Sequence, residues 1–455
     1  MRRSLPLLLG LMMFAGLASC ASRKHHAAAK RPAPQPLYAG HTATLDLTAG
    51  LRVNGIVSMP SVFTPDFNQP PMWLQQGSEI GVVGSMNGKT TLLGFGGPDF
   101  STRTIEAQDF GPAAPGGRIV DIAASPDGME LAAAVAESTQ NRLEVVLRDL
   151  ISSGQGHPAA TIDGDFEFAQ IQWLDAATVA LTLRASADVI TNVGGSGAGA
   201  AVVGGLYIIT VTGATAVQHL DGITCPLSAM SFSPSRYFAV GSGVGETVAP
   251  VIIATHEQRC RTLKLPAPIR VLGWAPDSSS MLYAASSGPG GAAGVFDFDL
   301  ASGGVSSVIA ISSGAAAYAS DGTVVALGNN QLSWRRLAQE PNRMVKAEIA
   351  LIAPRQHNID LNSLGFETIP ALMARAKMTF STASNDGVID AYLPGAAGPL
   401  RRLIEYSYQA RAAFVLGSGA TEGPIAMSWS PDGRLLAIVD GNATLNTLAV
   451  IAPAK

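Results

Sequence analysis

Short apolar runs alternate with polar turns along most of the chain, and one unit of this pattern recurs. The unit is an apolar strand ending in an aromatic or small residue, a tight turn, and a second strand of small and β-branched residues. The clearest copies start at Ile119, Leu227, Ile269 and Ile425, and weaker copies start at Met72, Phe168, Ala315 and Met378. The best turns read Ser-Pro-Asp-Gly, in which Pro sets φ, Asp bonds the backbone ahead and Gly takes positive φ. The pattern therefore predicts eight β-hairpins.

The eight turns fall near positions 76, 126, 175, 234, 276, 321, 386 and 431, spaced by about 50 residues on average. This spacing matches the blade length of β-propellers, in which four-stranded sheets surround a central axis. Only two clear strands follow the last turn, and Thr42–Thr48 is a free strand that could complete the last blade and remove an open sheet edge. We therefore predict an all-β fold for residues 38–455. It is a single β-propeller of eight four-stranded blades, with seven as the alternative, closed by an N-terminal strand.

The chain begins with the layout of an export signal. Arg2 and Arg3 precede the apolar stretch Leu5–Leu17, which is too short to cross a bilayer core, since a spanning helix needs about 20 residues. The residues that follow, Leu17-Ala18-Ser19-Cys20, resemble the bacterial lipobox, whose cysteine is acylated and becomes the new N-terminus. An ordinary cleavable signal with a cysteine nearby by chance is the alternative. We expect residues 1–19 to be a lipoprotein signal peptide and Cys20 to carry a lipid anchor in the membrane.

Residues 20–37 are expected to be the lipidated cysteine and a flexible tether. Residues 21–37 carry four basic residues, no acidic residue and three prolines, which is typical of an extended, solvated segment. A basic patch that touches anionic head groups is the alternative. In lipoproteins with this motif, a small neutral residue such as Ala21 after the cysteine suggests sorting to the outer membrane. The expected location is the bacterial cell envelope, at the outer membrane facing the periplasm.

The charge of the folded part argues against nucleic acid as a partner. The whole chain has a formal charge of −4, and residues 1–37 hold six cations and no acid, so the remainder carries −10. Binding of nucleic acid without sequence preference depends on Lys and Arg that neutralise phosphates. We therefore expect no nucleic-acid partner.

The three cysteines fit an exported protein. An odd cysteine outside the cytoplasm needs an explanation, which lipidation of Cys20 supplies. Cys225 and Cys260 then remain as a candidate disulfide in an oxidising compartment, with two buried free thiols as the alternative.

The repeated hairpin also carries a family resemblance. The Ser-Pro-Asp-Gly turn followed by a small-residue strand resembles the repeat of periplasmic TolB-type propellers, which are similar in style to WD-repeat propellers. The resemblance covers about eight short segments between residues 70 and 440, and it implies the fold but no functional residue. TolB proteins carry an α/β domain before the propeller and no lipobox. In those two respects the chain resembles the lipid-anchored propeller of the outer-membrane β-barrel assembly machinery, whose quinoprotein-style repeats are absent here.

The candidate chemical groups have structural explanations. Five acids each lie in a repeat turn, and we expect them to cap their turns: Asp127, Asp277, Asp321, Asp386 and Asp432. Four tryptophans end the first strands of their units, a placement that indicates packing between blades: Trp73, Trp173, Trp274 and Trp429. The segment His256–Cys260 lacks the paired histidines of a zinc helix, and the chain has no Gly-x-Ser-x-Gly elbow. We expect no catalytic residue, metal or cofactor.

The favoured function is that of a membrane-anchored scaffold whose propeller binds another protein of the envelope, without catalysis. Propellers suit this role because a rigid ring presents many loops on one face. A hydrolytic, lactonase-like propeller and a glycan-binding propeller are the alternatives, since one fold hosts many functions. Converging His, Glu and Asp in the central channel would favour an enzyme. Small residues such as Ala123, Ala124, Ala316 and Ala317, which occupy the first strands, favour the scaffold.

Overall fold

The computed structural model describes residues 51–97, 100–110, 117–137, 142–151, 156–164, 166–185, 205–211, 216–219, 227–243, 251–254, 259–265, 269–288, 291–309, 315–319, 322–328, 331–336, 357–360, 377–381, 387–395, 398–407, 412–419, 424–441 and 446–453. The chain divides into two compact units, Met1–Pro34 and Gln35–Lys455, and all described residues belong to the second.

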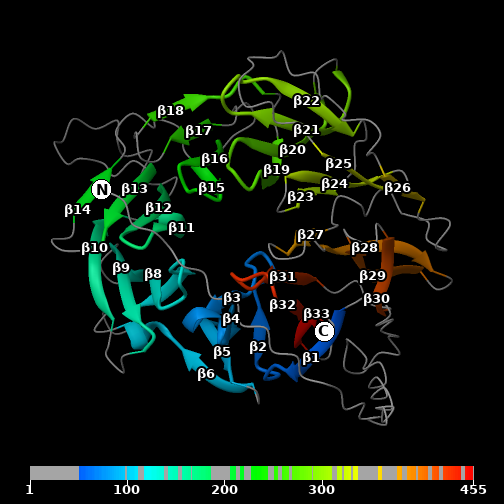
Figure 1. The fold of residues 1–455 in the computed structure, drawn as a ribbon. Coiled ribbons are helices and arrows are strands. Elements are labelled where there is room, and N and C mark those ends of the chain that lie inside the picture. The colour runs from blue at the N-terminus through cyan, green and yellow to red at the C-terminus, as the bar shows by residue number, and fades with distance from the viewer. Residues whose placement is uncertain are drawn as a thin grey trace, which may run out of the picture. The chain divides into compact units, whose positions relative to one another are not determined.

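The described residues form eight antiparallel sheets that follow one another along the chain (Figure 1). The first contains β2 (Phe63–Pro65), β3 (Met72–Leu74), β4 (Glu79–Met86), β5 (Lys89–Gly96) and β6 (Ser101–Ile105). The second contains β7 (Arg118–Ala124), β8 (Glu130–Glu137), β9 (Arg142–Asp149) and β10 (His157–Asp163). The third contains β11 (Phe166–Asp175), β12 (Thr178–Ala185), β13 (Gly205–Thr210) and β14 (Ala216–His219). The fourth contains β15 (Leu227–Phe232), β16 (Phe238–Gly243), β17 (Val251–Ala254) and β18 (Arg259–Thr262).

The second half of the chain continues the same order. The fifth sheet contains β19 (Ile269–Trp274), β20 (Ser280–Ala285), β21 (Gly294–Asp299) and β22 (Val305–Ile309). The sixth contains β23 (Ala315–Tyr318), β24 (Thr323–Gly328), β25 (Gln331–Arg336) and β26 (His357–Asp360). The seventh contains β27 (Lys377–Phe380), β28 (Gly387–Gly395), β29 (Gly398–Ser407) and β30 (Ala412–Gly419). The eighth contains β31 (Ile425–Trp429), β32 (Leu436–Asp440), β33 (Thr447–Pro453) and, from the other end of the described chain, β1 (Leu51–Ser58).

Each sheet packs against the next, and the succession returns to its start. Clusters of buried apolar side chains join consecutive sheets from the β31–β33 sheet through the first sheet to the sixth. Strand β23 then contacts β27, and β27 contacts β31. Four-stranded sheets that pack in this cyclic order make a β-propeller. The prediction of an all-β propeller is confirmed.

The eighth sheet joins the two ends of the described chain. Strand β1 pairs with β33 from Leu51 opposite Pro453 to Ser58 opposite Thr447, with a bulge between Val53 and Gly55. In Figure 1 the blue β1 accordingly lies beside the red β33. The sequence predicted Thr42–Thr48 in this place, which was wrong, because Leu51–Ser58 occupies it; Thr42–Thr48 itself lies outside the described residues.

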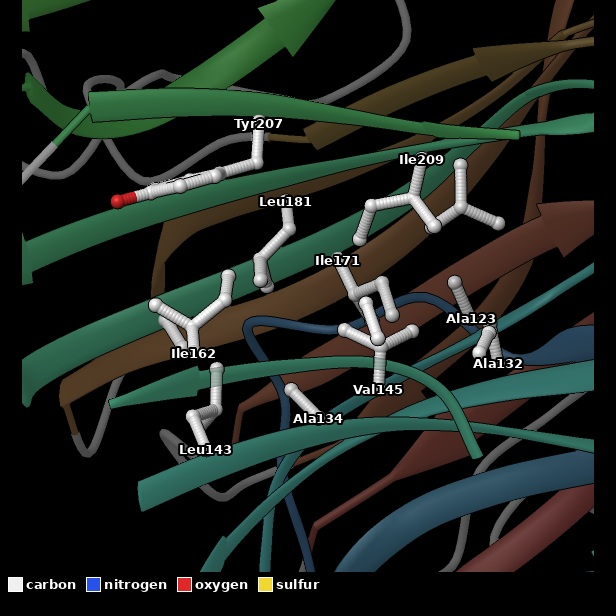
Figure 2. Close-up of a cluster of buried hydrophobic side chains, with 14 of the residues drawn as sticks. Ala123, Ala132, Ala134, Leu143, Val145, Ile162, Ile171, Leu181, Tyr207 and Ile209 are labelled. Atoms are coloured by element: carbon white, nitrogen blue, oxygen red, sulfur yellow. The ribbon is translucent and has the colours of Figure 1, made fainter. Parts of the chain in front are cut away.

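Small residues allow neighbouring sheets to pack closely. In β8, Ala132 and Ala134 are fully buried, and they face the larger Ile171, Leu181 and Ile209 of the next sheet (Figure 2). Small side chains on one sheet and branched ones on the other fill the space between two sheets at the density typical of protein interiors. This is why the second strand of the repeat is rich in alanine and β-branched residues.

The helical elements among the described residues are two short 3₁₀ helices, η2 (Gln75–Gly77) and η3 (Ala107–Phe110). In this part of the chain no helix is both long and apolar enough to cross a bilayer.

Candidate functional site

The turns between the first and second strands of the sheets have a repeated hydrogen-bond geometry. In the turn after β7, Asp127 Oδ1 accepts bonds from Ser125 Oγ at 2.7 Å and from the Met129 amide at 3.0 Å. The Glu130 amide donates to Ser125 Oγ at 2.9 Å, and the Gly128 amide donates to the Ser125 carbonyl at 2.8 Å. The side chains of Ser125 and Asp127 therefore bond within their own turn.

The turn after β31 has the same arrangement. Asp432 Oδ1 accepts from Ser430 Oγ at 2.6 Å and from the Arg434 amide at 3.1 Å. The bond from the Ser125 hydroxyl, and after it the bond from the Met129 amide, lowers the pKa of Asp127. The bond from the Ser430 hydroxyl is the main cause that lowers the pKa of Asp432. Both acids are therefore held as carboxylates that accept these bonds.

Of the three other turn acids, the structure describes Asp277. Asp277 Oδ1 accepts from the Ser279 amide at 3.0 Å and from the Ser279 hydroxyl at 2.6 Å. Asp321 and Asp386 lie outside the described residues.

The turns of consecutive sheets are bonded to one another. The Gln75 amide donates to the Gly128 carbonyl at 2.7 Å, which links the turn after β3 to the turn after β7. The Ser235 amide donates to Ser278 Oγ at 2.9 Å, and Ser381 Oγ donates to the Gly433 carbonyl at 2.5 Å. These bonds fix neighbouring turns relative to each other. They join the turns in pairs at one edge of the sheets. We call this edge the turn face and define it by residues 75–78, 125–129, 233–237, 275–279 and 430–434.

The turn face exposes a mixed set of side chains to solvent. Tyr237 is 54% exposed, which is unusual for a large aromatic residue in the part of the chain that the structure describes. The other exposed residues of the turn face are Gln76, Ser78, Pro126, Asp127, Pro234, Ser235, Pro276, Asp277, Pro431, Asp432 and Arg434. The turn face therefore combines one exposed aromatic residue with polar and charged surroundings.

The tryptophans at the ends of the first strands bond to the preceding sheet. Trp173 Nε1 donates to the Ala123 carbonyl at 3.2 Å, and Trp73 Nε1 donates to the Ser428 carbonyl at 3.2 Å. Trp274 Nε1 donates to Ser231 Oγ at 2.9 Å. All three indole rings contact apolar clusters between sheets, as the periodic placement predicted. Trp429 is half-buried, and its Nε1 has no partner among the described residues.

Two acids whose pKa is raised by burial were not predicted from the sequence. Asp121 on β7 is 8% exposed, and burial raises its pKa to about 6. Its Oδ1 accepts from Gln69 Nε2 at 2.6 Å and its Oδ2 accepts from the Ile171 amide at 2.8 Å. The one visible signal was an acid inside the apolar run Ile119–Ala124. Its partners lie 52 and 50 residues away in the chain, so the pairing could not be read from the sequence.

The second of these acids is Asp297 on β21, which is half-buried. It accepts a short hydrogen bond from the Tyr318 hydroxyl of β23, and the Tyr318 oxygen also bonds Ser280 Oγ at 2.7 Å. Burial raises the pKa of Asp297, and burial together with the neighbouring carboxylate raises that of Tyr318. The group joins the fifth and sixth sheets.

The remaining candidate residues are only partly placed. Cys260 lies in β18, the fourth strand of its sheet, opposite Ile253. Cys20 and Cys225 lie outside the described residues. Of the small residues expected at the channel, Ala123 and Ala316 are buried, and Ala124 and Ala317 are half-buried. Within the described ranges, no three His, Cys, Asp or Glu side chains come together as a candidate metal site.

Comparison with known proteins finds similarity to solved structures in fold alone. No protein-family model and no curated protein sequence matches the chain. The β-propeller domain of Cps50 (Swd1) from Myceliophteria thermophila is 10% identical, with a TM-score of 0.44 over 88% of this chain and 99% of that one. An oligogalacturonate lyase from Vibrio parahaemolyticus is 10% identical, with a TM-score of 0.48 over 90% and 94%. U3-55K is 12% identical, with a TM-score of 0.44 over 89% and 99%. At such low similarity, function has to be argued from the residues of this chain.

Proposed function

We propose that this protein is a lipoprotein of the bacterial envelope, anchored to the outer membrane through Cys20, whose propeller binds another envelope protein through the turn face. The eight sheets are the eight blades of this propeller, and β1 completes the last of them. The anchor follows from the lipobox-like residues Leu17-Ala18-Ser19-Cys20 and from the basic, acid-free tether that follows them.

The observation that carries the docking role is the set of hydrogen bonds between neighbouring turns. A surface held by bonds such as Gln75 to Gly128 loses little conformational entropy when a partner binds, so more of the contact energy appears as affinity. Tyr237 supplies an exposed aromatic ring with a polar tip, a residue type enriched in binding interfaces.

The acids of the described residues have structural partners. Asp127, Asp277 and Asp432 accept bonds within their own turns. Asp121 and Asp297 accept bonds from neighbouring sheets. These bonds support a scaffold, and no observation on the described residues favours the hydrolytic or the glycan-binding alternative.

The experiment combines fractionation with site-specific crosslinking in intact cells. A photo-crosslinking residue replaces Tyr237 on the turn face or, as the control, Val62, which is 55% exposed and lies beside the start of β2 at the opposite edge of the sheets. We expect one envelope protein to be captured from position 237 and not from position 62. Capture from position 62 alone, or from neither position, would contradict docking at the turn face.

The anchor is tested in the same strains. The Cys20→Ser variant should appear in the soluble periplasmic fraction with its fold intact, because the cysteine lies outside the propeller. Two or more acyl chains hold a protein stably at a membrane, and without them no strong attachment remains. If Cys20→Ser still sediments with membranes in high salt, the lipid anchor is wrong while the docking result stands by itself.

A further inference from the structure

The connection between β9 and β10 presents an exposed apolar side chain at the edge that holds the turn face. Asp149 lies opposite Glu130, the first residue of β8 after the turn 125–129, so this connection lies beside that turn. Ile151 is 69% exposed, the highest value among the large apolar side chains that the structure describes. A single exposed isoleucine is common on protein surfaces, so its meaning depends on its surroundings.

The backbone around Ile151 is fixed by hydrogen bonds. The Ile151 amide donates to Asp149 Oδ1 at 2.7 Å, and the Leu150 amide donates to the Met129 carbonyl at 2.9 Å. The connection is therefore tied to the neighbouring turn of its own sheet. An apolar side chain on a fixed backbone costs less conformational entropy to cover than one on a loose loop.

The turn of the first sheet continues this surface. The Gln75 amide donates to the Gly128 carbonyl at 2.7 Å, and the Gln76 amide donates to the Asp127 carbonyl at 3.2 Å. Three segments of the chain are thus bonded side by side. We call them together the docking patch and define it by residues 75–78, 125–130 and 149–151.

Two residues of the docking patch have a backbone conformation that costs energy in residues other than glycine. Gln75 and Gln76 have φ of 47° and 57°, in the left-handed region, whereas the turns of the second and eighth sheets place Gly128 and Gly433 at positive φ. Strain of this kind persists where surrounding bonds enforce it, and it is frequent at binding sites. Gln76 is exposed, and among the described residues no hydrogen bond engages its carboxamide.

The docking patch is acidic. Asp127 and Asp149 are exposed, Glu130 is half-buried, and the sequence of the patch contains no Lys, Arg or His. The neighbouring Arg148 is only 17% exposed and faces a different acid, since it donates to the Asp109 carbonyl at 2.9 Å and lies 3.6 Å from the Asp109 carboxylate. A positively charged surface is therefore complementary to the patch.

We propose that the docking patch is the principal contact of the turn face and takes a basic segment of the partner protein. In this segment an apolar side chain covers Ile151, and neighbouring Lys or Arg side chains face Asp127 and Asp149. The carboxamide of Gln76 offers an acceptor oxygen and two N–H donors to the same segment. The inference rests on the proposed docking role of the turn face and names the chemistry of the partner. Two copies of this chain docked patch to patch would bring like charges together, which disfavours self-association through this surface.

Photo-crosslinking from position 151 in intact cells tests where the partner binds and what its segment contains. The crosslinked peptide is sequenced by mass spectrometry. We expect the protein that is captured from position 237 to be captured from position 151 as well, through a segment in which Lys or Arg flanks an apolar residue. Capture from position 237 alone would overturn the docking patch and leave the proposed function standing, whereas capture from neither position would contradict both. Capture of a second copy of this chain, or of a segment without basic residues, would also overturn the proposal.

The affinity of the captured segment, made as a synthetic peptide, measures the apolar contact. The peptide is titrated with the full mature protein carrying Cys20→Ser and followed by fluorescence anisotropy. Ile151→Ser should weaken binding at least about tenfold, because it removes the apolar side chain that the segment covers. The matched control Val62→Ser changes a side chain that is 55% exposed at the opposite edge, and it should leave the affinity unchanged.

The charges are tested in the same titration. Asp127→Asn combined with Asp149→Asn keeps the acceptor oxygens that bond the backbone and removes two charges. We expect this double variant to bind about fivefold more weakly at low salt and to lose most of the salt dependence of binding. The control Asp163→Asn removes an exposed acid at the opposite edge and should change neither quantity. A salt dependence that persists in the double variant would disprove the role of the acids.

The strained residue is tested by Gln76→Gly, which relieves the left-handed strain and removes the carboxamide. This variant should bind the peptide more weakly without any fall in Tm, which separates a lost contact from a lost fold. The control Asn87→Gly makes the same kind of change at φ of 52° in the β4–β5 turn of the opposite edge, and it should leave binding unchanged. Natural affinity in Gln76→Gly or in Ile151→Ser would overturn the proposal.

Discussion

Replacing Gly128 by alanine tests whether neighbouring turns support one another. Gly128 has φ of +69°, and a Cβ there would lie 2.5 Å from the Trp73 carbonyl oxygen and 3.0 Å from Leu74 Cα. Gly303 provides the matched control, because its φ is also +69° and nothing lies within 4 Å of its added Cβ. Both substitutions carry the cost of an L-residue in the left-handed region, about 1–2 kcal/mol. Only Gly128→Ala also meets the backbone of the adjacent sheet.

The additional loss at Gly128 can be estimated from its contacts. The opposing atoms belong to the backbone, so no side-chain rotation relieves the clash, and the turn has to move away from β3. Overpacking of this kind costs about 1–3 kcal/mol. The movement also breaks the bond from the Gln75 amide to the Gly128 carbonyl, worth about 1 kcal/mol. We expect Gly128→Ala to lose about 3–6 kcal/mol of unfolding free energy and Gly303→Ala about 1–2 kcal/mol.

Urea unfolding followed by tryptophan fluorescence measures both losses under the same conditions. Trp73 is a local reporter, because the added Cβ would meet its carbonyl oxygen, and its indole bonds to the Ser428 carbonyl of the eighth sheet on the other side of the first sheet. If the two variants lose the same free energy within about 0.5 kcal/mol, the contact between the turns contributes nothing and the rigidity argued for the turn face fails.

Two further predictions concern the edge of the eighth sheet and the cysteines. Deleting residues 38–50 should leave the melting curve nearly unchanged. Deleting residues 38–58 should lower the free energy of unfolding by several kcal/mol out of a typical 5–15 kcal/mol, because β33 loses its partner β1. Equal melting temperatures of the two deletion variants would contradict the closure. Cys225 and Cys260 should form a disulfide in protein prepared from the envelope, since closing the loop between them stabilises the fold by about 3–4 kcal/mol through restriction of the unfolded chain. Alkylation without reduction, followed by mass spectrometry, tests this, and labelling of both thiols would disprove the disulfide.

The repeat was readable because its information is local. Each predicted turn falls in the connection between the first and second strand of a sheet, from the one near residue 76 to the one near residue 431. A turn such as Ser125–Gly128 is determined by bonds within six residues, so its sequence alone identifies it. Positive φ did not always need glycine, since Arg236 and Ser278 adopt φ of 63° and 62° at the corresponding place in their turns. Those two turns were found through their prolines.

The features that the sequence did not reveal depend on distant partners. Strand β1 carries a bulge at Gly55 that interrupts its alternation, whereas Thr42–Thr48 alternates regularly, so the pattern favoured the wrong segment. The split of the inner strand into β2 and β3 depends on which part of β4 each piece meets. The role of Asp121 depends on Gln69 and Ile171, which approach it only when three sheets are in place.

The position of β1 also bears on how a partner could reach the turn face. Strand β33 runs toward the edge that holds the turn after β31, and Leu51 lies opposite its last residue, Pro453. The chain therefore enters the propeller at the edge that carries the turn face. With a lipid on Cys20, the intervening residues can extend no further than about 110 Å, because each spans at most about 3.6 Å. A protein bound at the turn face would then lie at the edge where β1 begins, and Cys20 could lie no further than this length from Leu51. This restricts the proposed partner to proteins held at, or close to, the same membrane.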